Sequence, residues 1–291
     1  MNRSTASGDG LRDRFARALD TRAVASTRAV ADRYTRGGGG LLAGGLAYSA
    51  LFAIVPAVFL VVGATASFIG DPVLRVEIER IIVTVLPPIA GLVTVVLAEA
   101  ARDAATLSLL GVVGLAWGAS RFIVAFQDAM DRMLDGTHRR GVVRQNALAA
   151  VALLVLIAGL AAGVLLAGVS SLLDAAAAAG SIPLVRPTVG VLLAVTPPAL
   201  TAFAIGVAYR FVPSQKMPWR AVAAPAITVT VALTALARVF VFLAPRLIGA
   251  AAVLGSLVTV FASLAWLNLS FQAILLGAAW MGDRARESSR D

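Results

Sequence analysis

The stretch GLAYSALFAIVPAVFLV, from Gly45 to Val61, lies inside an uncharged run that extends from Gly37 to Gly70. A second uncharged run extends from Leu247 to Gly282. About 20 apolar helical residues cross the hydrocarbon core of a bilayer, and both runs are longer than that. Both therefore predict membrane-spanning helices, although the first contains two polar residues and a proline.

The composition of the whole chain agrees with an integral membrane protein. Of the 291 residues, 59% are apolar and 14% are charged, and the mean hydropathy is +0.87. This leaves too few polar groups to cover a water-soluble globule of this size. The alternative, a soluble helical protein very rich in alanine, does not explain the long uncharged runs.

Several classes of function are excluded by residue usage. Cysteine is absent and His138 is the single histidine, which excludes disulfides, thiolate zinc sites and histidine-rich metal sites. The net charge of +9 fits basic cytoplasmic loops better than a nucleic-acid partner. No nucleotide-binding or hydrolase motif is present, so we expect no enzyme, no cofactor and no metal.

The charges divide the chain into a basic cytoplasmic arm (1–36), one transmembrane domain (37–282) and a short cytoplasmic tail (283–291). The arm lacks the features of a cleavable signal, so the first span is expected to remain as an anchor. Apolar residues at helical spacing in the arm (Leu11, Phe15, Ala18 and Leu19) suit a helix on the inner leaflet, and a disordered arm is the alternative. The predicted spans are 41–67, 104–126, 145–172, 187–209, 220–244 and 250–280.

The distribution of charge predicts six spans with both termini in the cytoplasm. The arm contains eight Arg and four Asp, net +4, residues 121–144 have net +2, and residues 210–220 have net +3. With six spans, all of these segments lie on the cytoplasmic side, as the positive-inside rule requires. Residues 70–103, with three Arg and five acids, then lie outside.

A seventh uncharged stretch, at 81–98, contains Pro87 and Pro88. The two prolines remove backbone donors from the middle of the stretch. If it crossed the membrane, the basic loops that follow would move outside. We therefore expect a non-crossing or re-entrant segment.

Glycines four residues apart recur along the predicted spans. Such small-xxx-small spacing lets a neighbouring helix backbone approach closely and indicates a compact bundle. The pairs are Gly40 and Gly44, Gly114 and Gly118, and Gly159 and Gly163.

Polar residues within the spans are the first candidates for a functional site, because they are costly in lipid. Asn268 and Gln272 lie one helical turn apart in the last span and share a face. They either form hydrogen bonds between helices or line a path for substrate or water. Arg238 lies toward the outer boundary, where it either reaches the headgroups or, with Arg246, binds a phosphate or carboxylate.

The second span ends in a run of charges. Arg121, Asp128, Asp131 and Asp135 share one side of the expected helix. Paired carboxylates can hold a metal or exchange protons, and the alternative is a solvated face balanced by arginines. His138 is expected to be an ordinary loop histidine. Prolines in the first and fourth spans either kink the helix or expose carbonyl groups to a ligand: Pro56, Pro197 and Pro198.

Five segments occur together in an order and spacing typical of one family. They are AYSALFAIVP (47–56), LPP (86–88), LAWGASRFIVAFQDAMDRM (115–133), AYRFVPSQKMPWRAVAAPA (208–226) and LGSLVTVFASLAWLNLSFQAILLGA (254–278). Over about residues 40–280 the chain resembles the YihY/BrkB family of bacterial inner-membrane proteins. The most telling positions are Tyr209, Arg210, Pro213, Trp219, Trp266 and the pair Gly277 and Ala278.

This resemblance implies a six-span fold, location in the bacterial cytoplasmic membrane and a role in envelope integrity. Some members carry an old label as a ribonuclease, but this chain lacks a metal-binding His–Asp cluster and has short loops. The chain also departs from the family pattern. Ala279 stands where members often have an acidic residue, Asp131 where they often have Asn, and Leu254 where they often have Tyr.

Two functions follow as hypotheses. In the first, the protein transports a lipid or small solute along a path lined by Tyr48, Ser49, Asn268 and Gln272, with a gate at Pro56. In the second, it is a scaffold that transports nothing and binds partners in envelope assembly. Membrane lipids, an unidentified substrate, and either a second copy or an assembly protein are the expected partners.

Overall fold

The computed structural model describes residues 25–68, 90–135, 185–215, 217–250 and 256–287, and the regular structure within these ranges is helical. A short helix at 25–36 comes first. The longer helices are α2 (Gly39–Phe68), α4 (Ala90–Met133), α6 (Val185–Phe211), α7 (Trp219–Ala250) and α8 (Ser256–Glu287). The predicted all-helical class is therefore confirmed for the described residues.

Four of the described helices are long and apolar enough to cross a membrane. Their apolar windows are Gly39–Ala57, Leu109–Met133, Trp219–Leu243 and Val260–Arg286. These windows lie in helices that cover the predicted first, second, fifth and sixth spans. The predicted third span, 145–172, lies outside the described residues, and α6, which is not one of the four, covers the predicted fourth span. The count of six spans remains a prediction.

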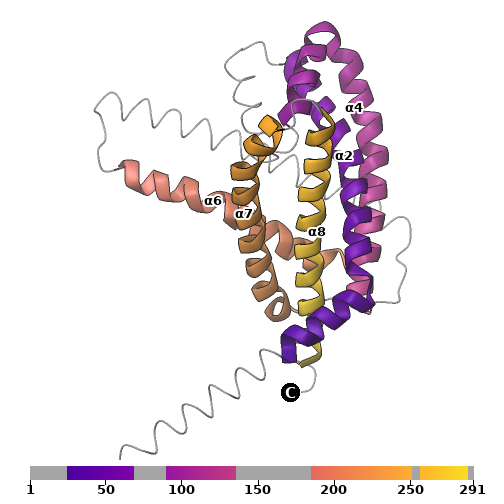
Figure 1. Cartoon of the computed structure of the whole chain (residues 1–291), viewed down its shortest axis with the longest axis vertical. Coiled ribbons are helices and arrows are strands. Elements are labelled where there is room, and N and C mark those ends of the chain that lie inside the picture. Colours follow the sequence, from indigo (N-terminus) through magenta and orange to yellow (C-terminus); the bar gives the residue numbers. More distant parts are fainter. Residues whose placement is uncertain (1–24, 69–89, 136–184, 216, 251–255, 288–291) are drawn as a thin grey trace, which may run out of the picture.

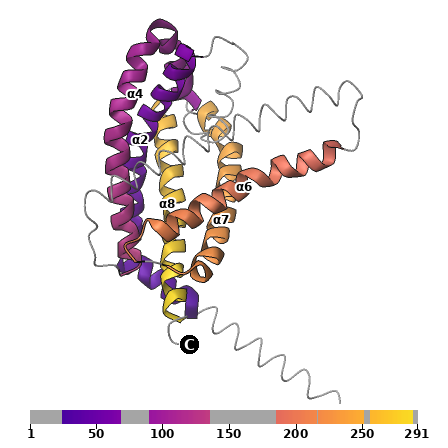
Figure 2. The same ribbon diagram turned by 180° about the vertical axis from the view of Figure 1, so that it is seen from behind.

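The helices form a bundle in which α8 is central. Helix α8 packs on α2, on α7 and on the end of α4, while α2 pairs along its length with α4 (Figure 1). Helix α6 packs on α7 but crosses the bundle obliquely, and its first part projects away from the other helices (Figures 1 and 2). The bundle thus has one closely packed side, made by α2, α4 and α8.

The buried core lies toward the end of the bundle where α2 begins and α4 and α8 end. Met130 and Met133 of α4 are fully buried there, as are Leu275 and Met281 of α8, and Leu46 of α2 is 1% exposed. The segments that the charge pattern places together on one side of the membrane meet at this end.

The helix at 25–36 joins α2 through a tight turn at two glycines. The amide of Gly37 donates to the carbonyl of Arg33, at 2.9 Å, and Gly38 has a φ of +70°. Left-handed backbone of this kind favours glycine at a helix end. The turn directs Val30 and Tyr34 onto the core. The end of the basic arm is thus part of the bundle, whereas residues 1–24 lie outside the described residues.

Helices α2 and α4 approach so closely that glycine is required between them. A Cβ atom added to Gly118 would lie 2.6 Å from the carbonyl oxygen of Phe52, and one added to Gly114 would lie 2.9 Å from the ring of Pro56. The predicted role of this glycine pair in helix packing is confirmed. Helix α2 continues through Pro56. By contrast, an added Cβ at Gly44 would meet nothing within 4 Å, and Gly159 and Gly163 lie outside the described residues.

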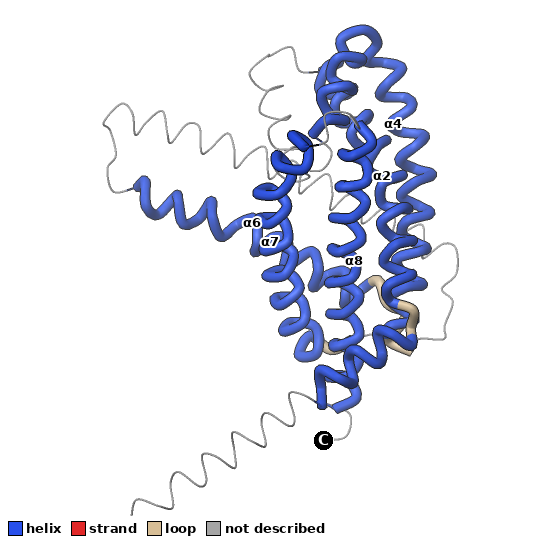
Figure 3. The backbone as a smooth tube through the Cα atoms, viewed as in Figure 1, coloured by secondary structure: helices blue, strands red, loops and turns tan. Residues whose placement is uncertain are grey.

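The segment at 81–98 is only partly described. Residues 90–98 are the first part of α4, so they belong to the same helix as the second span instead of forming a separate element. The tube of α4 curves over at the end of the bundle far from the C-terminus (Figure 3). Residues 81–89, with the two prolines, lie outside the described residues.

Candidate functional site

The acidic residues at the end of α4 separate into different environments. Asp131 accepts hydrogen bonds from the backbone amide of Ser214, at 2.7 Å, and from the Ser214 hydroxyl. Asp128 and Arg121 are exposed. Among the described residues, no three His, Cys, Asp or Glu side chains lie where they could hold a metal ion. The observed role of Asp131 is to fix the loop between α6 and α7.

Tyr209 and Arg210 also have structural partners. The Tyr209 hydroxyl is buried and donates to the carbonyl of Ile274 on α8, at 2.6 Å. A Cβ added to Gly277 would lie 2.3 Å from this hydroxyl oxygen, so the glycine makes room for the tyrosine. Arg210 donates to the carbonyl of Met217, and its guanidinium lies 5.3 Å from the centre of the Trp219 ring. Both residues join α6 to its neighbours.

Of the two polar residues of the first span, Tyr48 is exposed and Ser49 is half-buried, and neither belongs to the buried core. Tyr48 is 59% exposed and its ring contacts Phe52, at 4.7 Å between centroids. The Ser49 hydroxyl donates to the carbonyl of Gly45, at 2.9 Å, within the same helix. The small residues Ala47 and Ala50 occupy the inward face instead. Tyr48 therefore does not turn into the bundle as expected, and it does not share a lining with Asn268 in the described part of the chain.

Two amide side chains within the apolar windows have buried oxygens that accept no hydrogen bond from the described residues. They are the Oε1 atom of Gln127 on α4 and the Oδ1 atom of Asn268 on α8. The indole nitrogen of Trp266 is likewise buried without an acceptor there. Gln272 is half-buried and Arg238 is exposed. Asn268 is one of the residues predicted from the sequence, whereas Gln127, which follows directly after the predicted limit of the second span, is not.

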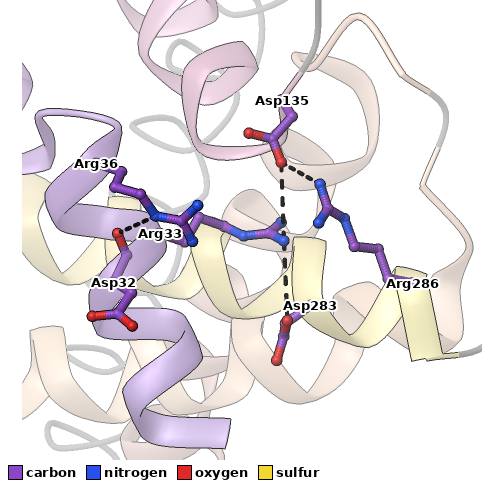
Figure 4. Close-up of polar contacts among 6 residues, drawn as sticks. All are labelled: Asp32, Arg33, Arg36, Asp135, Asp283 and Arg286. Carbon is purple, nitrogen blue, oxygen red and sulfur yellow. Dashed lines mark hydrogen bonds and ion pairs between the residues drawn. The ribbon is translucent and has the colours of Figure 1, made fainter.

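A cleft rich in arginine opens at the end of the bundle where α4 and α8 end. It has a volume of about 540 Å³. Figure 4 shows Arg33 and Arg286 with the carboxylates that pair with them, and Arg36, which donates to the backbone carbonyl of Asp32. We call it the arginine cleft, and its lining residues are Arg33, Arg36, Gly37, Arg132, Asp135 and Arg286.

Ion pairs connect the three chain segments that form the arginine cleft. Arg286 of α8 donates to the carboxylate of Asp135, which follows α4 (Figure 4). The Nη2 atom of Arg33 lies 3.9 Å from Oδ2 of Asp135 and 4.0 Å from Oδ1 of Asp283. Asp135 has a φ of 55°, a left-handed conformation that Asp adopts more readily than most residues.

Arg33 is an unusually buried cation. Its side chain is 9% exposed, and its Nη1 atom is buried without an acceptor among the described residues. Burial and the nearby charge of Arg286 lower the pKa of the Arg33 guanidinium, while two neighbouring carboxylates act in the opposite direction. Both carboxylates lie beyond the usual length of a charged hydrogen bond, about 2.7–2.9 Å. The charge of Arg33 is therefore only partly compensated.

The arginine cleft is not predicted from the sequence. The charged residues that line the cleft are predicted to belong to separate parts of the chain: the basic arm, a solvated helix face and the tail. The available signal was the predicted topology, which places the end of the arm, the end of the second span and the tail on one side of the membrane. Only the fold shows that Arg33, Asp135 and Arg286 are neighbours.

Comparison with known proteins identifies the family. A family model described as virulence factor BrkB matches residues 30–290. The chain belongs to the BrkB family. It is also similar to a UPF0761 membrane protein of Nitrosospira multiformis, with 26% identity over 242 residues, 81% of this chain. The chain spans 55% of the length of that relative. No solved structure matches the chain.

The family assignment confirms the resemblance found in the sequence, and it includes the cleft. The matched range begins just before Arg33 and ends just after Arg286. Both sides of the cleft are therefore part of this BrkB protein's family region.

Proposed function

We propose that this BrkB protein is a multi-pass protein of the bacterial cytoplasmic membrane that moves a lipid or a small solute across the bilayer and so supports envelope integrity. The observation that carries the proposal is the pair of buried amide oxygens on Gln127 and Asn268. They lie on α4 and α8, the two helices that flank α2 on the closely packed side of the bundle.

The energetic argument concerns the cost of leaving such atoms unpaired. A buried oxygen without a donor costs about 1–3 kcal/mol relative to one that is hydrogen-bonded. Polar groups that persist inside spans usually face the bundle interior or a water-filled cavity, or they bond to another helix. A substrate or water that donates to these oxygens while passing through the bundle would offset their cost.

The experiment is transport by purified protein in liposomes. Lipid scrambling and solute flux are measured for wild type, Gln127→Leu and Asn268→Leu. The proposal expects wild type to be active and both variants to lose at least about tenfold in rate, the effect of roughly 1.4 kcal/mol. Ser270→Ala is the matched control, because the buried Ser270 hydroxyl already donates to the carbonyl of Trp266 within α8, at 2.8 Å.

The melting temperature separates transport from packing. If the oxygens have no partner in the protein, replacing them with leucine leaves the melting temperature unchanged or raises it. If they bond to another helix, the variants melt lower, and the packing interpretation is correct. Absence of flux from folded wild-type protein contradicts the proposal and favours the scaffold that binds envelope-assembly partners.

A further inference from the structure

The arginine cleft contains more positive charge than its carboxylate can balance. Its lining has four arginines and one aspartate, net +3. Including Asp283, which lies near Arg33, still leaves an excess of two positive charges. Charges in a partly enclosed cleft are screened less than those on an open surface, so the excess creates a local field that attracts anions.

The lining of the cleft also includes a buried cation. Arg33 is more than nine-tenths buried and has an Nη1 atom without an acceptor among the described residues. This nitrogen packs against Gly282, where an added Cβ would lie 2.2 Å away. The glycine lets Arg33 lie against α8 and hold its charge beneath the cleft. A buried charge of this kind is costly unless a counter-charge approaches it.

The remaining arginines are positioned to contact a bound group directly. Arg36 and Arg132 are exposed and line the cleft from different segments, and Arg286 is held in place by Asp135. Guanidinium groups present several donors in a planar fork that matches the oxygens of phosphate. A volume of about 540 Å³ leaves room for the group to which the phosphate is attached.

Tryptophans beside the cleft indicate that it lies at the level of the membrane interface. On α8, the guanidinium of Arg284 lies 5.7 Å from the centre of the Trp280 ring, just before the cleft residue Arg286. At the same end of the bundle, Trp219 is exposed and pairs with Arg210. Tryptophan concentrates at the level of lipid headgroups. A phosphate at this depth can come from a lipid headgroup or from a soluble compound.

From these observations we propose that the arginine cleft binds a phosphate group. The site is independent of the proposed transport, because it lies at the end of the bundle and uses none of the amide oxygens within the spans. Its ligand is defined by chemistry: a phosphate ester, on an anionic lipid or free in solution, held by Arg36, Arg132 and Arg286 above the buried charge of Arg33.

The test measures how far phosphate raises the melting temperature of the full-length protein in nanodiscs of phosphatidylcholine. It consists of two series of measurements. In one series, inorganic phosphate and glycerol phosphate are titrated in chloride buffer. In the other, phosphatidylglycerol replaces part of the phosphatidylcholine and no soluble phosphate is added. A ligand that binds the folded state raises the melting temperature, and the rise grows with the logarithm of the ligand concentration once that concentration exceeds the Kd.

The variants show whether the cleft is responsible. In Arg36→Gln combined with Arg132→Gln, we expect the apparent Kd to rise about tenfold for each lost charged hydrogen bond, about a hundredfold together. Arg28→Gln is the matched control, since Arg28 is exposed on the same short helix and does not line the cleft. Both variants preserve Arg33, whose loss would endanger folding.

The two series of measurements distinguish the source of the phosphate. A rise in melting temperature that grows with ligand concentration, that the double variant loses and that Arg28→Gln retains supports the site. The series in which it occurs identifies a lipid or a soluble ligand. The proposal is overturned if folded wild type shows no such rise in either series. It is equally overturned if Arg28→Gln weakens binding as much as the double variant, because general attraction to a basic surface then explains the effect.

Discussion

The carboxylate of Asp131 holds Ser214, 83 residues away in sequence, through both of its oxygens: one accepts the backbone amide at 2.7 Å and the other accepts the hydroxyl. This contact joins the end of α4 to the loop between α6 and α7. It gives Asp131 a structural role that requires neither metal nor proton chemistry.

The contact predicts different effects for two substitutions of Asp131. In Asp131→Asn, the amide oxygen can still accept from the Ser214 amide and the NH₂ group can donate to the hydroxyl. We expect stability within about 1 kcal/mol of wild type. In Asp131→Leu, both acceptors are lost and stability falls by about 1–3 kcal/mol.

Unfolding in detergent, followed by circular dichroism, measures both effects. Transport in liposomes is measured in parallel. A functional proton or metal site would need the acid itself, so an Asp131→Asn protein that folds normally but loses transport would contradict the structural role.

The glycine contact between α2 and α4 predicts a steric effect. In Gly118→Ala, the new methyl group would lie 2.6 Å from a backbone oxygen of Phe52, which cannot move without shifting the helix. Overpacking of this kind costs about 1–3 kcal/mol. The melting temperature should fall accordingly.

Gly45→Ala is the matched control for this substitution. An added Cβ there meets nothing within 4 Å, and alanine favours a helix more than glycine does, by about 1 kcal/mol. Its melting temperature should equal or exceed that of wild type. Equal losses in the two variants would mean that general helix effects, and not the close contact, determine stability.

The sidedness of the bundle can be tested with single cysteines, because the natural chain contains none. Gln215 is exposed in the loop between α6 and α7, at the end that we propose is cytoplasmic. Thr106 is exposed on α4, before its membrane-spanning window. In intact cells, a membrane-impermeant maleimide should label Thr106→Cys. It should leave Gln215→Cys unlabelled until the membrane is permeabilised. The opposite pattern would reverse the orientation.

The sequence was informative where one physical rule dominates. Length and hydropathy predicted the helices that contain Pro56 and Asn268, because a long uncharged run of residues is expected to cross the bilayer as a helix. The spacing of Gly114 and Gly118 predicted a close helix contact, and the structure shows it between α2 and α4.

The roles of individual polar residues could not be predicted from their spacing in the sequence. Tyr48 is polar, but its small neighbours Ala47 and Ala50 take the inward face and turn it outward. Arg33 resembled any other charge of the arm, since its burial arises only after the turn at Gly38 brings it against α8. Such placements depend on contacts between segments that are far apart in the sequence. A single sequence does not show these contacts.

The glycine contact also limits where a substrate could travel. At Gly114 and Gly118 the contact between α2 and α4 is too close to admit even one extra carbon atom, so nothing can pass between the two helices there. Tyr209 fills the space beside Gly277 where α6 touches α8, near the end that contains the arginine cleft. The route of the proposed transport must therefore avoid these two places, and a cross-link at either of them should leave transport intact.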